Sequence, residues 1–181
     1  MPEIKYILDE SDFLLLQLYS ASKDEAIKKQ RRKEGYRLAG LSVICGLVLL
    51  FDDFYTTYAY YMLGAGVLLF FVYPMWSAWY YKRMFKKQVS THYKDRFPAE
   101  SIINVDDEKL EIINQNGAYN FHPSEIRSIT ETKDYFYIRI NEFICPIPKS
   151  KVDKDIVYHQ LMYYHKTFDV SYIEDINWRW K

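Results

Sequence analysis

The chain has 181 residues, which is enough for one ordinary domain and a small membrane segment. Its 24 basic and 24 acidic side chains cancel, so no net charge argues for a nucleic-acid or an acidic partner. The two cysteines, Cys45 and Cys145, are too few and too far apart for a disulfide framework or a metal site. Both are expected to be buried as small apolar residues, and no cofactor is expected.

The N-terminal segment, residues 1–35, is predicted to be cytoplasmic. Glu3–Leu8 is expected to form a short strand, and Asp9–Ser11 offers side chains that cap helices. Asp12 to Lys33 is predicted to form one amphipathic helix with a basic end. That end either lies on anionic headgroups or serves only to set the orientation in the membrane, and both alternatives stay open.

Residues 36–81 are predicted to form a transmembrane hairpin of two helices. Phe54 to Tyr81 is uncharged and exceeds the roughly 20 apolar residues that a helix needs to cross a bilayer. Leu38 to Phe51 is shorter and spans only if its flanking residues lie among the headgroups. Pro74 is expected to kink the second helix or to mark its exit. Small residues favour close packing within the hairpin or, alternatively, between copies of the chain: Ser42, Gly46, Gly64 and Gly66.

Aromatic and charged side chains border this hairpin. Tyrosines near its loop, and Tyr and Trp near the end of the second stretch, are typical of membrane interfaces. The loop contains Asp52 and Asp53 but no base, whereas both outer flanks are basic. Because cytoplasmic loops are rich in Lys and Arg, both termini are predicted to be cytoplasmic in a multi-pass protein of the cell membrane. The candidate contacts for anionic headgroups are Lys28, Lys29, Arg31, Arg32, Lys82, Arg83, Lys86 and Lys87.

Residues 82–100 are predicted to be a basic connector, and residues 101–181 a cytoplasmic α+β domain. Short strands are expected there, with turns at 106–108 and 114–117. An amphipathic helix that Asp153 caps is expected to follow them. The predicted strands are Ile102–Val105, Lys109–Ile113, Ala118–Phe121, Glu125–Glu131, Tyr135–Ile140 and Phe143–Ile147.

Two stretches of the chain resemble one protein family. FHPSEIRSITETKDYFYIRINEFICPIPK, from Phe121 to Lys149, resembles the C-terminal domain of the YcxB-like proteins, and YILDESDFLLLQLYSAS resembles their N-terminal segment. Many members have a Trp shortly before the strand that matches Ile126–Glu131, where this chain has Phe121 and His122. The resemblance implies a membrane-anchored domain similar to pleckstrin-homology (PH) or GRAM folds, an antiparallel curved sheet capped by a C-terminal helix. It implies no catalytic residue.

Isolated polar residues offer weaker candidates. His122 beside Glu125 or Asp134 could form a base–carboxylate pair, although turn residues of this kind are usually only solvated. Trp178 and Trp180 favour docking at a membrane interface, packing on the domain, or disorder. Basic residues of the strand region could gather on one sheet face and bind a headgroup, or simply face solvent. They are Lys109, Arg127, Lys133, Arg139, Lys149 and Lys151.

The chain contains no motif for nucleotide hydrolysis or for a metalloprotease. It is therefore expected to be no enzyme, but a membrane-anchored binding or regulatory module. Its expected partners are the bilayer, anionic headgroups, a protein or a second copy of the chain, and no nucleic acid. The alternative is an accessory subunit of a transporter or membrane enzyme complex, in which Asp52 and Asp53 would matter for ion coupling.

Overall fold

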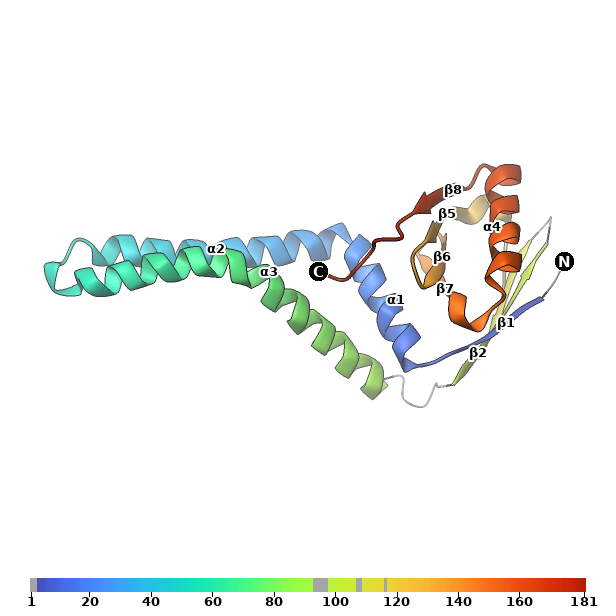
Figure 1. Ribbon diagram of the computed structural model, residues 1–181, viewed down its shortest axis with the longest axis horizontal. Coiled ribbons are helices and arrows are strands. Elements are labelled where there is room, and N and C mark those ends of the chain that lie inside the picture. The colour runs from blue at the N-terminus through green and yellow to red at the C-terminus, as the bar shows by residue number, and fades with distance from the viewer. Residues whose placement is uncertain (1–2, 93–97, 107–108, 116) are drawn as a thin grey trace. The chain divides into compact units, whose positions relative to one another are not determined.

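The computed structural model describes residues 3–92, 98–106, 109–115 and 117–181 (Figure 1). The predicted turn residues Asp107, Glu108 and Asn116, and part of the predicted connector, lie outside them. The chain forms two compact units. The first, called the β domain, comprises Met1–Gln17 and Lys87–Arg179; the second, called the helical hairpin, comprises Leu18–Lys86 and Trp180–Lys181.

The elements follow one another as strand, helices, strands, helix and strand. They are β1 (Glu3–Leu8), α1 (Glu10–Lys23), α2 (Glu25–Leu49), α3 (Thr56–His92), β2 (Ala99–Val105), β3 (Leu110–Asn114), β4 (Gly117–Phe121), β5 (Ile126–Glu131), β6 (Tyr135–Ile140), β7 (Phe143–Pro148), α4 (Lys154–Phe168) and β8 (Ser171–Glu174). All the strands and the helix predicted for the C-terminal region are confirmed to within a few residues. The fold belongs to the α+β class.

The N-terminal helical region is broken where one continuous helix was predicted. α1 ends at Lys23, and α2 begins at Glu25. Asp24 lies between them with extended backbone, and its Oδ1 accepts hydrogen bonds from the amides of Ala26 (2.7 Å) and Ile27 (3.3 Å). A carboxylate that bonds the free amides of a first helical turn is a strong helix start. The basic cluster therefore belongs to the same helix as the first apolar stretch.

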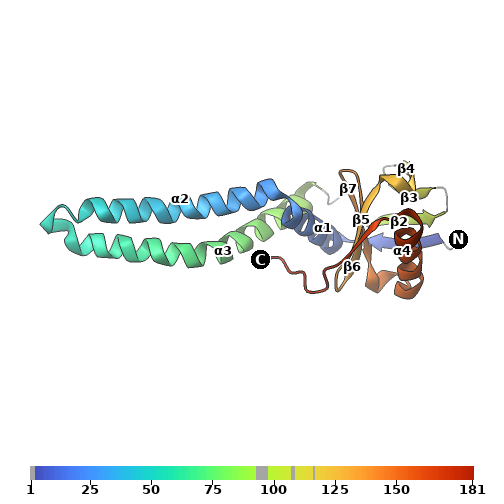
Figure 2. The same cartoon turned by 90° about the horizontal axis from the view of Figure 1, so that it is seen from above.

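α2 and α3 run side by side and are joined by a short loop (Figures 1 and 2). Asp52 caps the short 3-10 helix in this loop, because its Oδ1 accepts a hydrogen bond from the amide of Phe54 at 2.9 Å. α3 contains Pro74, and it continues to His92, beyond the predicted end at Tyr81. The proline leaves the helix unbroken, although α3 changes direction along its length (Figure 1).

Small residues bring the two helices close together. A Cβ on Gly46 would lie 2.8 Å from Leu63 Cγ, and a Cβ on Gly66 would lie 2.7 Å from Val43 Cγ2. Ser42 Oγ also donates to the backbone oxygen of Met62 at 2.8 Å. Packing within the hairpin is thus confirmed for Ser42, Gly46 and Gly66. Gly64 makes no such contact within the hairpin, since a Cβ there would meet no atom within 4 Å, and packing between copies of the chain stays a prediction.

We expect Gly46→Leu to destabilise the hairpin by about 1–3 kcal/mol, because the larger side chain must push α3 away from α2. The matched control is Gly40→Leu, since a Cβ on Gly40 meets nothing within 4 Å. Thermal unfolding of the two full-length variants in the same detergent measures the difference. Equal midpoints for the two would contradict the close packing.

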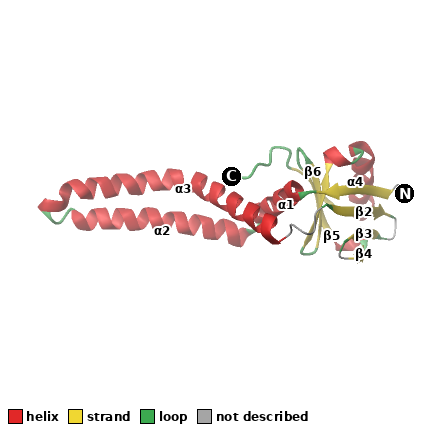
Figure 3. Cartoon of the chain, turned by 90° about the horizontal axis from the view of Figure 1, so that it is seen from below, coloured by secondary structure: helices red, strands yellow, loops and turns green. Residues whose placement is uncertain are grey.

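The strands of the β domain form two sheets, with the orders β1-β2-β3-β4 and β7-β6-β5-β8. Alternate residues of strands such as β1 and β2 are buried in one core, to which both sheets and α4 contribute. Figure 3 shows the strands of the domain in yellow and α4 in red. The deepest apolar residues, with 1% exposure or less, include Ile103, Ile129, Phe136 and Ile147. Five of the six residues of β6 are buried, so this strand contributes to the core from both of its faces.

β1 and β2 pair although the whole hairpin lies between them in the sequence. They are antiparallel, with Leu8 opposite Ala99 and Glu3 opposite Asn104. Ile4, Tyr6 and Leu8 belong to the shared core and are about 5% exposed. The N-terminal strand is thus part of the same domain as the C-terminal strands, a pairing that strand propensity alone does not reveal.

A strand that was not predicted, β8, completes the second sheet. It pairs with β5 in parallel, with Ile129 opposite Tyr172. The Tyr172 hydroxyl donates to Glu131, and Lys149 Nζ forms an ion pair with the same carboxylate at 2.6 Å. Burial raises the pKa of Glu131, but the hydrogen bonds from Lys149 and Tyr172 outweigh it and leave that pKa lowered.

A polar cluster joins the start of α1 to the rest of the β domain. Asp12 is 2% exposed; its Oδ1 accepts from the Tyr135 hydroxyl at 2.6 Å, and its Oδ2 lies 2.6 Å from Lys151 Nζ. Lys151 also bonds Asp9 at 2.7 Å. Burial lowers the pKa of Lys151, but these carboxylates outweigh it and raise that pKa above 10.5. The cluster thus satisfies a buried carboxylate with a cation and a phenol.

The two cysteines differ. Cys145 is buried as predicted, and burial raises the pKa of its thiol to about 11. Cys45 is exposed on α2, so the prediction of a buried residue is wrong there. The reason is that α3 covers only one side of α2.

Candidate functional site: a basic groove on the helical hairpin

A groove of about 500 Å³ lies on the hairpin between α2 and α3. Its size falls within the range of small-molecule sites. From α2 it is lined by Lys28, Arg31, Arg32, Gly35 and Tyr36, and from α3 by Phe70, Phe71, Tyr73, Pro74 and Ser77. The lining therefore combines three cations with a largely aromatic wall.

Helical spacing explains why these side chains share one face. On α2 the lining positions follow Lys28 at three, four, seven and eight residues, which is one stripe of a helix. On α3 they follow Phe70 at one, three, four and seven residues. Gly35 leaves room for the facing ring, since a Cβ there would lie 2.7 Å from Tyr73 Cδ1. Pro74 lacks an amide hydrogen and so removes the helical partner of the Phe70 carbonyl.

Arg31 makes both hydrogen bonds and aromatic contacts at the groove. Its Nε donates to Ser77 Oγ at 2.9 Å, and its Nη2 donates to the backbone oxygen of Lys181 at 2.9 Å. The guanidinium also lies over the rings of Tyr81 (5.5 Å) and Trp180 (4.9 Å). Burial lowers the pKa of Arg31 from its usual value, but a guanidinium remains charged at neutral pH.

Other polar contacts fix the edges of the groove. Lys28 Nζ forms an ion pair with Glu25 at 2.7 Å, one turn away on α2. The Tyr73 hydroxyl donates to Glu34 at 3.1 Å, and the Tyr36 and Phe70 rings stack with centroids 5.9 Å apart. The Glu25 pair is exposed and contributes little, so Lys28 can exchange it for another anion.

The structure gathers three of the eight predicted headgroup contacts, Lys28, Arg31 and Arg32, in this groove. Lys29 is on α2 but does not line the groove, and Arg83 on α3 lies over the ring of Trp79 at 5.4 Å. Lys82, Lys86 and Lys87 are on α3 outside the groove. The aromatic wall was missed, because it depends on the register between α2 and α3; the spacing of Lys28, Arg31, Gly35 and Tyr36 was the available signal.

Three of the other candidates, His122, Lys149 and Lys151, have structural roles. His122 caps the 3-10 helix Pro123–Glu125: the Ser124 amide bonds its ring, and its own amide bonds the Glu125 carboxylate at 2.7 Å. Among the cations of the strand region, Lys149 and Lys151 are engaged by the carboxylates of Glu131, Asp9 and Asp12. Within the described residues, no group of three or more His, Cys, Asp or Glu could hold a metal.

The end of the chain packs on the hairpin helices. Trp180 Nε1 donates to the backbone oxygen of Ala78 at 2.8 Å. Together with the stacking of Arg31 on its ring, this places Trp180 against both α2 and α3. Trp180 therefore packs on the hairpin helices, a contact that none of the alternatives for the tail named.

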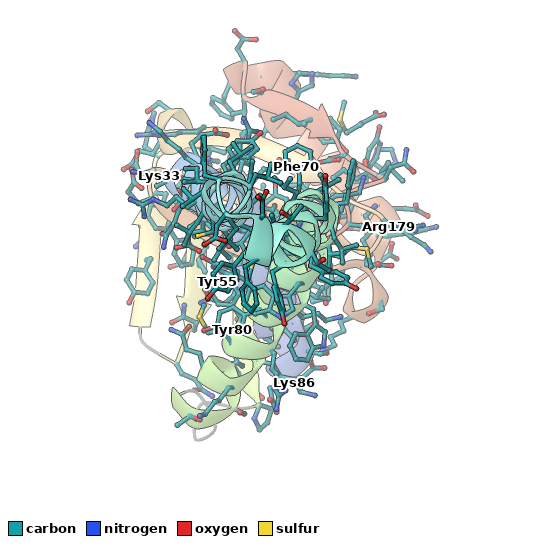
Figure 4. All side chains as sticks on the ribbon, turned by 90° about the vertical axis from the view of Figure 1, so that its left-hand side faces the viewer. Lys33, Tyr55, Phe70, Tyr80, Lys86 and Arg179 are labelled. Atoms are coloured by element: carbon teal, nitrogen blue, oxygen red, sulfur yellow. The ribbon has the colours of Figure 1, made fainter. Side chains whose placement is uncertain are left out.

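The hairpin exposes a large apolar surface. Figure 4 shows side chains of the hairpin around the ribbons, among them Tyr55 in the loop and Phe70 on α3. Among the described residues, one helical stretch, Asp53–Thr91, has the length and composition to cross a membrane; its most apolar window has a mean hydropathy of 1.5 and is 17% buried. The exposed apolar residues on the two helices include Leu41, Ile44, Val48, Val67, Leu68, Phe71 and Met75.

Comparison of the chain with models of protein families, with curated proteins and with solved structures finds no match. The functional argument therefore depends on the groove, the apolar surface and the topology.

Proposed function

We propose that this chain is a two-pass membrane protein that anchors the β domain, with both termini, at the cytoplasmic face. In this proposal the β domain is a non-enzymatic binding or regulatory module, and the hairpin holds it close to anionic headgroups. The observation that carries the proposal is the pairing of β1 with β2 across the hairpin.

That pairing restricts how the chain can cross a membrane. β1 precedes the hairpin and β2 follows it, and their backbones are joined by antiparallel hydrogen bonds. Strands of one sheet must lie on the same side of a bilayer, so the chain between them must cross an even number of times. If α3 spans, the return path is α2, whose apolar part is short. This supports two spans over one.

The exposed surface of the hairpin supports insertion. Soluble monomers rarely expose contiguous apolar patches larger than a few hundred Å². Leu41, Ile44 and Val48 on α2 are each about 60% exposed, as are Val67 and Leu68 on α3. Lipid chains would cover these side chains, and the exposed Cys45 with them. The basic residues at the outer ends favour the cytoplasmic side for both termini.

The architecture of the β domain supports a binding module. Two mainly antiparallel sheets with a helix, α4, are compatible with a PH-like domain, as the resemblance to YcxB-like proteins implies. The buried charged groups of the domain hold its elements together, as in the Asp12–Tyr135–Lys151 cluster and the Glu131–Lys149 pair. These groups are therefore engaged in the fold and leave the surface for binding. We therefore propose that the domain binds a partner or headgroups at its surface.

Cysteine accessibility in intact cells tests the proposed orientation. Thr56 begins α3 at the loop, and Ser171 begins β8 in the β domain. In a Cys45→Ala background, we expect Thr56→Cys to react with an impermeant maleimide in intact cells, and Ser171→Cys to react only after lysis. The reverse pattern, or lysis-dependent labelling of both sites, would show that the proposed orientation is wrong.

A further inference from the structure

We infer that the basic groove of the hairpin binds one anionic glycerophospholipid, with its phosphate at Arg31 and Arg32 and its chains along the aromatic wall. This inference rests on the proposed membrane insertion. It goes further, because it assigns a stoichiometric site to three of the many basic residues near the membrane.

The charge of the groove selects an anion. Lys28, Arg31 and Arg32 contribute three cations, and none of the ten lining residues is acidic. The nearby carboxylates of Glu25 and Glu34 are engaged by Lys28 and by the Tyr73 hydroxyl. A phosphate that enters therefore meets positive charge in a partly desolvated setting, where charge-assisted hydrogen bonds are strong.

Arg31 is preorganised to hold a phosphate. A guanidinium has five N–H donors, and the bonds to Ser77 and Lys181 use two of them. The remaining donors stay available, while Ser77 and the stacked ring of Trp180 restrict the side chain. Lys28 is one turn before Arg31 on α2, and Arg32 is the next residue; both line the same groove, so they can bond the other phosphate oxygens.

The opposite end of the groove favours a lipid over a soluble phosphate ester. This end is lined by Tyr36, Phe70 and Phe71. Each of these side chains is at least half exposed. This wall continues into the exposed apolar residues of α2 and α3, such as Leu41 and Val67. A ligand that matches both ends has an anionic head joined to apolar chains. Basic pockets between membrane helices on the cytoplasmic side bind such headgroups.

The test compares two double variants with the same change in net charge. Lys28→Gln/Arg32→Gln removes groove cations, whereas Lys29→Gln/Lys33→Gln removes neighbouring cations of α2 that do not line the groove. Each full-length protein is reconstituted in phosphatidylcholine vesicles that contain a minor fraction of phosphatidylglycerol. Native mass spectrometry of the released protein then counts the bound lipids. Resistance to carbonate extraction, measured first, reports insertion separately.

We expect the parent and Lys29→Gln/Lys33→Gln to retain one phosphatidylglycerol per chain, and Lys28→Gln/Arg32→Gln to retain it about tenfold less. Arg31→Lys is expected to show a similar loss, because an ammonium cannot replace the fork of donors. Equal retention by inserted double variants overturns the lipid site but leaves the membrane anchor intact. Displacement of the lipid by glycerol 3-phosphate at equal concentration would also overturn it, since the site would then select free phosphate esters. Extraction of the parent protein by carbonate would instead refute the proposed membrane anchor.

Discussion

Replacing Lys151 by Met is expected to destabilise the β domain by about 3 kcal/mol, because the change leaves a buried carboxylate without its cation. Asp12 is almost fully buried, and Lys151 Nζ lies 2.6 Å from its Oδ2. The Tyr135 hydroxyl would remain as a donor but would not supply charge. Chemical denaturation of the full-length protein, followed by the circular dichroism of the strands, measures the loss.

Two further variants separate this effect from a general loss of charge. Lys154→Met removes an exposed cation at the start of α4 and is expected to change stability by no more than about 0.5 kcal/mol. Asp12→Asn/Lys151→Met removes both charges, and its destabilisation should be smaller than the sum of the single variants. Additive losses would mean that the two side chains do not depend on one another.

Replacing Leu68 by Arg is expected to reduce membrane integration of the chain by about a hundredfold. Leu68 lies near the middle of the apolar part of α3 and is 63% exposed. A charged residue at the centre of a membrane helix costs about 2.5–3.5 kcal/mol on insertion scales, which corresponds to about two powers of ten in an equilibrium. The fraction of newly made protein that resists carbonate extraction measures the effect.

Tyr58→Arg is the matched control, because Tyr58 is 60% exposed but lies near the loop, where interfacial charge costs less. Its integration is expected to stay close to that of the parent. If the apolar surface of the hairpin faced water, both variants would behave alike and would change stability by less than about 0.5 kcal/mol. That result would remove the membrane proposal.

The sequence predicted the positions of the helices and strands better than it predicted which strands pair with one another. The strands from β2 to β7 and the Asp153 cap follow from alternation, turns and capping residues within a few positions of each other. The break at Asp24 has a readable signal, a capping carboxylate, but the periodicity around it favours one helix. β8 is only four residues long and depends on a parallel partner, β5, that is distant in sequence.

The groove was predictable on one side only. The stripe of Lys28, Arg31 and Arg32 follows from the period of α2, so the cations could be found without a structure. The aromatic wall comes from α3, and which face of α3 meets α2 is set by the close contacts at Gly46 and Gly66. A sequence shows that small residues allow such contacts, but it does not fix which of them are used; Gly64 is not.

The pairing of β1 with β2 also has a consequence for biosynthesis. During translation, β1 leaves the ribosome before β2 has been synthesised. Its apolar residues Ile4, Tyr6 and Leu8 therefore have no β2 to pack with while the whole hairpin is made. In the proposed two-pass arrangement, the hairpin would engage the insertion machinery during this interval, and the β domain would close only afterwards. Membrane delivery would then precede completion of the sheet. The order of synthesis itself would prevent premature folding of the β domain in the cytosol.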